Sequence, residues 1–220
     1  MLVDLLQSQP GMVCDGEILR QKVRFPKLFM EARARRAVHA GADFYGCKVL
    51  VSQLDRIQRL GDPAAFLARL DAHGWALLGL TRRNVLRQSL SWLWAMQRDD
   101  YHQRRGNDSP SSGPETLTVA PDQLIAMMGL SEQASRFVDE VTAAARRWLK
   151  LTYEDDLEQP DRHQATVDAV MGWLGACSAP ASTELVPTGA GRLAERISNF
   201  DDVTAAVRRT RFAPLLEGEN

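Results

Sequence analysis

Residues 76–84 read Ala76-Leu77-Leu78-Gly79-Leu80-Thr81-Arg82-Arg83-Asn84, an apolar run that ends in two arginines and an asparagine. A short continuous apolar run is typical of a buried strand in a parallel sheet. The next residues predict a helix, because apolar side chains recur at helical spacing at Leu86, Leu90, Leu93 and Trp94. Where such a strand leads into a helix, free backbone N–H groups can bind an anion. The stretch therefore predicts a phosphate site in an α/β fold.

Two basic residues and a serine share the more polar face of that expected helix. Arg83, Arg87 and Ser91 are spaced by one helical turn each. The alternative interpretation is that Arg83 is an ordinary surface arginine and Ser91 a helix serine with no special role. The spacing alone does not separate this interpretation from phosphate binding.

Several segments together resemble the PAPS-dependent sulfotransferases, the enzymes that use 3′-phosphoadenosine 5′-phosphosulfate (PAPS). An Arg-Asn pair at a strand end, with a serine eight residues after the arginine, is similar to their 3′-phosphate signature and maps to Arg83 and Ser91. Other segments resemble segments of the carbohydrate and nodulation-type sulfotransferases and follow one another in the same order along the chain. They are 1–6 with Pro10 and 16–19, Gly46-Cys47-Lys48-Val49, Leu151-Thr152-Tyr153-Glu154-Asp155 with Leu157 and Pro160, and Ile197-Ser198-Asn199-Phe200 with Phe212-Ala213. The resemblance implies an α/β, P-loop-NTPase-like three-layer fold with a central parallel sheet.

Two residues carry the chemistry that the resemblance implies. Glu17 maps to a glutamate that acts as general base on the acceptor hydroxyl, a role that needs a base within hydrogen-bond reach of that proton. Lys48 maps to a lysine that neutralises charge on the bridging oxygen as the sulfuryl group leaves. The alternatives are an ordinary loop acid for Glu17, and for Lys48 a side chain that extends from a strand edge into water.

The resemblance also implies two further contacts with the nucleotide. Tyr153 maps to a tyrosine near the adenine, although a tyrosine at a strand end is more usually part of a core or its rim. Arg192 lies in the glycine-containing stretch 188–192, where the family folds a loop over the nucleotide, but the motif differs here.

The chain departs from the family at its beginning. The family opens with a strand and a Gly/Ser-rich loop whose backbone amides hold the 5′-phosphosulfate. No Arg-Ser-Gly-Ser or Lys-Ser-Gly-Thr run occurs in the 220 residues, so this first strand and P-loop are missing. Either the true start lies upstream of Met1 or the chain is a truncated relic. The alternative function is then a catalytically inactive nucleotide-binding or interaction protein of the same fold. A P-loop kinase is disfavoured because the Walker lysine loop is also missing.

Composition sets the remaining expectations. A length of 220 residues with 45% hydrophobic residues predicts one domain, 1–220, with a flexible loop over 105–116. The 27 basic and 28 acidic residues nearly balance, so the composition gives no reason to expect nucleic acid as a partner, and the resemblance implies a carbohydrate, lipid or small-molecule acceptor. No apolar run approaches the roughly 18 residues needed for a membrane span, so we expect a cytoplasmic protein.

The cysteines and histidines give no sign of a metal site. Neither the three cysteines (Cys14, Cys47 and Cys177) nor the four histidines have metal-ligand spacing, so no metal is expected. The oligomeric state is left open.

The pattern also assigns elements along the chain. It predicts a helix over 1–9, strands over 12–14, 45–51, 75–80 and 149–153, and helices over 63–73, 121–148 and 162–174, with one more arginine-rich helix near the end. Residues 25–40 are basic and irregular, and are expected to form a loop with a short helix. The alternation of strands and helices indicates βαβ units.

Overall fold

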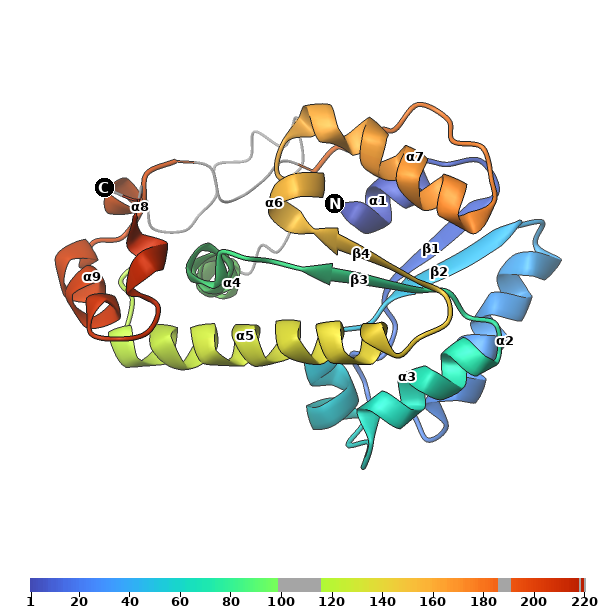
Figure 1. Ribbon diagram of the computed structural model, residues 1–220, viewed down its shortest axis with the longest axis horizontal. Coiled ribbons are helices and arrows are strands. Elements are labelled where there is room, and N and C mark those ends of the chain that lie inside the picture. The colour runs from blue at the N-terminus through green and yellow to red at the C-terminus, as the bar shows by residue number, and fades with distance from the viewer. Residues whose placement is uncertain (99–115, 186–190, 218, 220) are drawn as a thin grey trace. The chain divides into compact units, whose positions relative to one another are not determined.

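The computed structural model describes residues 1–98, 116–185, 191–217 and 219 (Figure 1). The chain forms two compact units. The first consists of 1–81 and 136–183, and the second of 82–135 and 184–220. The prediction of a single domain stays a prediction, because two compact units can still fold as one cooperative body. The expected loop at 105–116 lies, except for Thr116, outside the described residues.

The first unit contains the four strands of the described residues and most of the helices near them in sequence, but not α4, which follows β3. In chain order its elements are α1 (Leu2–Gln7), β1 (Met12–Glu17), α2 (Pro26–His39), β2 (Phe44–Lys48), a π-helical turn (Gln53–Ile57), α3 (Pro63–Ala72), β3 (Leu77–Thr81), the end of α5 (Pro121–Ala143), β4 (Trp148–Thr152), α6 (Tyr153–Asp156), a 3₁₀ turn (Pro160–Arg162) and α7 (His163–Leu174).

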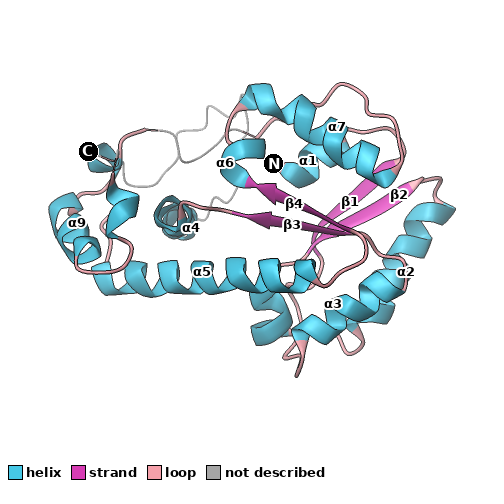
Figure 2. Ribbon diagram, viewed as in Figure 1, coloured by secondary structure: helices cyan, strands magenta, loops and turns pink. Residues whose placement is uncertain are grey.

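The strands pair in parallel, β1 with β2 and β3 with β4. The prediction of an α/β fold with parallel strands is therefore confirmed, but the strands form two two-stranded sheets in the described residues, not one continuous sheet. Figure 2 shows α1 and α7 on one side of the strands and α2 and α3 on the other. Each helical layer has its own core, one around Leu5 and Val167 and the other around Met30 and Phe66.

Two expected elements differ from the structure. Residues 26–39 form one continuous helix, α2, instead of a loop with a short helix. The reason is that Pro26 occupies its first turn, where proline is favoured, and most of the residues that follow are strong helix formers. Strand β2 ends at Lys48, so Val49, Leu50 and Val51 are not part of it.

The second unit is helical. It contains α4 (Val85–Arg98), the first part of α5, α8 (Leu193–Arg196), α9 (Phe200–Arg208) and a 3₁₀ turn (Ala213–Leu216). The expected apolar face of α4 is confirmed, because Leu86, Leu90 and Leu93 are buried in one core and Trp94 packs against it. That core also takes Leu124 and Met128 of α5, and residues of α8 and α9. Burial of Leu86, Leu90 and Leu93 leaves Arg87 and Ser91 on another face of α4, and Arg83 lies just before the helix.

Candidate functional site

Helix α4 begins four residues after β3 ends, as the pattern predicts. Asn84 caps it, since Asn84 Oδ1 accepts a hydrogen bond from the backbone N–H of Arg87 at 2.9 Å. Asparagine is one of the preferred residues at this position because its side chain satisfies a backbone donor that has no helical partner. Arg83 is exposed immediately before the cap. The local sequence thus fixes where α4 starts and places Arg83 at that start.

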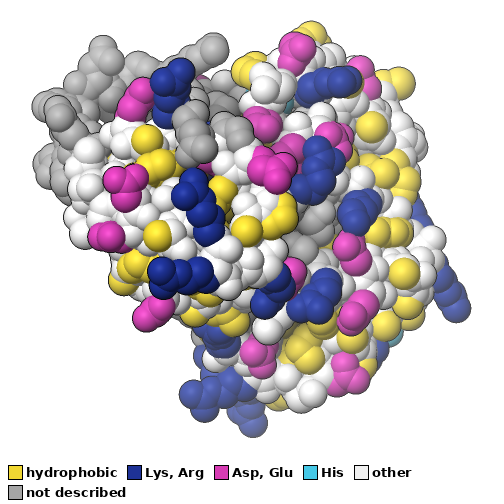
Figure 3. All heavy atoms as spheres, turned by 60° about the vertical axis from the view of Figure 1, so that its left-hand side comes forward, with side chains coloured by type: hydrophobic (Ala, Val, Ile, Leu, Met, Phe, Trp, Pro, Cys, Tyr) yellow, Lys and Arg dark blue, Asp and Glu magenta, His cyan; other side chains and the backbone are white. Residues whose placement is uncertain are grey.

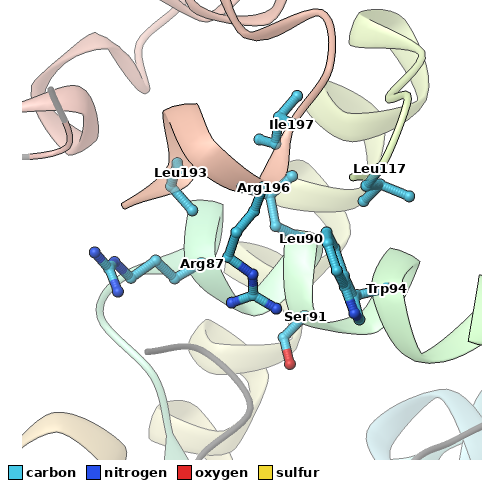
Figure 4. A pocket seen from close by; sticks show the side chains of 8 residues that line it. All are labelled: Arg87, Leu90, Ser91, Trp94, Leu117, Leu193, Arg196 and Ile197. Carbon is cyan, nitrogen blue, oxygen red and sulfur yellow. The ribbon is translucent and has the colours of Figure 1, made fainter. Parts of the chain in front are cut away.

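A small cavity lies along the Ser91 side of α4. Figure 4 shows its lining residues, and the polar ones are Arg87, Ser91 and Arg196, with the indole of Trp94 beside them. The apolar remainder of the wall is formed by Leu90, Leu117, Leu193 and Ile197. Its volume is about 20 Å³, which is room for about one water molecule. The cavity can therefore hold one small polar group but not a whole nucleotide.

Arg196 is the charged residue of this cavity that the sequence analysis did not single out. Its guanidinium lies over the ring of Trp94, with Cζ 4.4 Å from the centroid, a favourable cation–π geometry. In Figure 4 the guanidinium of Arg196 lies close to the Ser91 hydroxyl. The predicted Arg192 is instead exposed at the N-cap of α8 and is not among the lining residues. The role of Arg192 stays a prediction.

A buried carboxylate pairs with the Arg87 guanidinium. Glu219 Oε1 accepts from Arg87 Nε at 2.6 Å and Oε2 accepts from Nη2 at 2.8 Å, a bidentate pair. Asn84 Nδ2 lies 3.4 Å from the same Oε1. Glu219 is only 6% exposed. No local pattern could have predicted this contact, because 132 residues separate Arg87 from Glu219.

Glu17 and Lys48 lie at the ends of β1 and β2 and are brought together by the strand register. They are paired across the two strands next to a β-bulge, and Lys48 Nζ lies 2.8 Å from Glu17 Oε1. Gln53 Nε2 donates to the other carboxylate oxygen, Oε2, at 2.8 Å. Two donors therefore orient the Glu17 carboxylate, while each oxygen keeps a second lone pair. Because both side chains are about one-third to two-fifths exposed, a plain strand-end ion pair explains this contact equally well.

Tyr153 is the first residue of α6, directly after β4. Its ring is half-buried against the core around Leu5 and Val167. This is the core-rim environment that the alternative interpretation describes, and contact with an adenine stays a prediction.

A charged cluster that the sequence did not predict joins β1, β2 and α2. Asp15 Oδ2 accepts from Arg33 Nε at 2.7 Å and from the Tyr45 hydroxyl at 2.6 Å. The hydrogen bond from Arg33 holds the pKa of Asp15 below its usual range. Burial, together with the bond to Asp15, raises the pKa of the Tyr45 hydroxyl. The cluster fixes α2 on the sheet, so we assign it a structural role.

The three thiols and one histidine differ in their burial. All three cysteines are free, and Cys177 is exposed while Cys14 and Cys47 are partly buried. Burial raises the pKa of Cys14 to about 11 and of Cys47 to about 12. His163 is buried, with Nε2 3.0 Å from the Leu157 carbonyl oxygen.

The described residues contain no group of three or more His, Cys, Asp and Glu side chains that could hold a metal ion. None of the described helices is long and apolar enough to cross a bilayer. On the face that Figure 3 displays, acidic and basic side chains are mixed and do not form one patch of single sign.

Comparison of the chain with protein-family models, with curated proteins and with solved structures finds no match. The functional conclusion therefore rests on the residues themselves.

Proposed function

We propose that this chain has the function of a PAPS-dependent sulfotransferase, which transfers a sulfuryl group to a hydroxyl of a carbohydrate, lipid or small-molecule acceptor. The observation that carries the proposal is the polar face of α4. Arg83 lies two residues before α4, a helix that begins four residues after the parallel strand β3 ends, and Arg87 and Ser91 lie on successive turns of that helix. The two guanidinium groups and the hydroxyl can supply charge-assisted donors for a phosphate.

The cavity beside Ser91 adds to this argument. Arg196 brings a third guanidinium to the same region from a different element, α8. Its position over Trp94 limits the directions in which it can donate, so less freedom is lost when it binds an anion. We assign the 3′-phosphate to Arg83 and Ser91, with Arg196 as an additional donor.

In the proposed reaction the acceptor oxygen bonds to sulfur while the bond from sulfur to the bridging phosphate oxygen breaks. The acceptor proton passes to Glu17, and Lys48 stabilises the negative charge that develops on the bridging oxygen. Gln53 holds the Glu17 carboxylate in a fixed orientation through its 2.8 Å hydrogen bond. Tyr153 and Arg192 keep their proposed roles at the adenine and over the nucleotide.

The strand pairing is consistent with the proposed P-loop-like fold. Each described strand pairs with only one other. One further parallel strand beside β3 would pair with the backbone edge that no described strand pairs with. We propose that a phosphosulfate-binding strand and loop take this place.

The proposal is tested by calorimetric titration with 3′-phosphoadenosine 5′-phosphate, using ATP as the comparison ligand. Loss of a hydrogen bond to a charged group costs about 1.5–3 kcal/mol. Arg83→Ala should therefore weaken binding about 10- to 100-fold, and Ser91→Ala should weaken it less. Arg208→Ala is the matched control, because Arg208 is an exposed arginine on α9 of the same unit. Equal affinity in the Arg83→Ala and Arg208→Ala proteins would overturn the assignment.

A second candidate function is favoured by the lack of a Gly/Ser-rich phosphosulfate loop among the 220 residues. A catalytically inactive protein of this fold would bind the desulfonated nucleotide without turnover. The two functions separate in a sulfuryl-transfer assay with a panel of hydroxyl acceptors. Turnover that is lost in Glu17→Gln supports the enzyme, whereas nucleotide binding with no turnover supports the inactive protein.

A further inference from the structure

The proposed phosphate-binding residues already contact a carboxylate of the same chain, that of Glu219. Arg87 lies in the first turn of α4, one turn before Ser91, and Arg83 lies two residues before the helix begins. Its guanidinium donates two hydrogen bonds to the Glu219 carboxylate. An arginine uses the same fork of donors for a carboxylate and for a phosphate. Glu219 therefore occupies the middle of the surface that a bound phosphate would need.

We propose that Glu219 is a built-in competitor at this site, so that a phosphate-bearing ligand must displace its carboxylate before it can bind Arg87. The proposal rests on the assignment of Arg83 and Ser91 to the 3′-phosphate. Two anions near one guanidinium repel each other, and burial strengthens that repulsion. Glu219 thus lowers the affinity of the site for a phosphate-bearing ligand. The ligand can bind Arg87 only after the Glu219 carboxylate has left it.

The packing of the preceding residues allows such an exchange. Leu216 is buried in the core of the second unit, while Glu217 is exposed. The Glu219 backbone N–H donates to the Leu216 carbonyl oxygen at 3.2 Å. Because Glu219 lies three residues beyond Leu216, loss of this hydrogen bond and of the contact with Arg87 would not require Leu216 to leave the core.

The test compares Glu219→Gln with Glu217→Gln, which removes the same charge from an exposed position two residues away. Both variants and the wild-type chain are titrated with inorganic phosphate and with 3′-phosphoadenosine 5′-phosphate. Removal of a directly competing carboxylate should tighten binding of both ligands about tenfold or more in Glu219→Gln. Glu217→Gln should bind like the wild-type chain.

Hydrogen exchange on the unmodified chain gives a second readout. Saturation with the nucleotide should increase exchange in peptides covering 213–220 and decrease it at the start of α4. Unchanged protection of 213–220 at saturation would overturn the proposal, even if Glu219→Gln did not fold.

The outcomes separate this inference from the proposed function. If Glu219→Gln tightens phosphate but the nucleotide binds no better than phosphate, the competitor is supported and the nucleotide assignment fails. If the nucleotide binds through Arg83 but Glu219→Gln has unchanged affinity, Glu219 is only a structural ion pair. If neither ligand binds any folded variant, both proposals fail.

Discussion

Substitution of Gly79 tests the packing that holds the strand before the candidate site. In β3 this position has no side chain, and a Cβ built there would overlap Trp148 Cζ3 and lie 2.9 Å from Val138 Cγ1. Ordinary carbon–carbon contacts are about 3.5–4.0 Å. Gly79→Ala must therefore push the Trp148 ring away or separate β3 from β4.

The magnitude follows from two opposing effects. Overpacking in a well-packed region costs about 1–3 kcal/mol. Replacing glycine by alanine restricts the unfolded chain and returns about 0.4–1 kcal/mol. The net loss in the free energy of unfolding is then about 1–2 kcal/mol, or a decrease in Tm of roughly 2–8 °C for a chain of this size.

The assay is urea denaturation followed by tryptophan fluorescence, together with a thermal melt. Gly172→Ala is the control, because a Cβ at Gly172 in α7 meets nothing within 4 Å. Alanine in a helix interior should stabilise the chain by about 0.5–1 kcal/mol. The reasoning would be refuted if Gly79→Ala were as stable as the wild-type chain, or if both substitutions shifted stability in the same direction.

Three further predictions concern buried polar groups and thiols. Gln58→Leu should lower the free energy of unfolding by about 2 kcal/mol in urea denaturation, because the Gln58 side chain bonds three backbone groups between residues 19 and 23. In Asp15→Asn, the free energy of unfolding should fall less on acidification than in the wild-type chain. The reason is that the lowered pKa of Asp15 contributes stability that is present above the ordinary carboxyl pKa of about 4 and is lost as the pH falls below it. At pH 8 an aromatic disulfide reagent should modify exposed Cys177 rapidly and Cys14 and Cys47 slowly, because burial raises the pKa of these two thiols to about 11 and about 12; equal rates measured by mass spectrometry would contradict this.

Local patterns in the sequence determined much of the strand and helix content. The apolar run before Arg83 became β3, with bounds shifted by one or two residues, and the helical repeat after it became α4 with the expected buried face. Such patterns are reliable because strand and helix periodicities depend on residues only a few positions apart. They failed at α2, where basic residues were interpreted as a loop although they are good helix formers.

The composition of the candidate site was decided by tertiary structure. The sequence placed Arg83 and Ser91 on one helix face, but it could not reveal that Arg196 lines the same cavity or that Glu219 binds Arg87. It proposed Glu17 and Lys48 separately, and only the β1–β2 register made them an ion pair. Periodicity records which face a side chain takes on its own element. Which distant element then packs against that face depends on the fold of the whole chain.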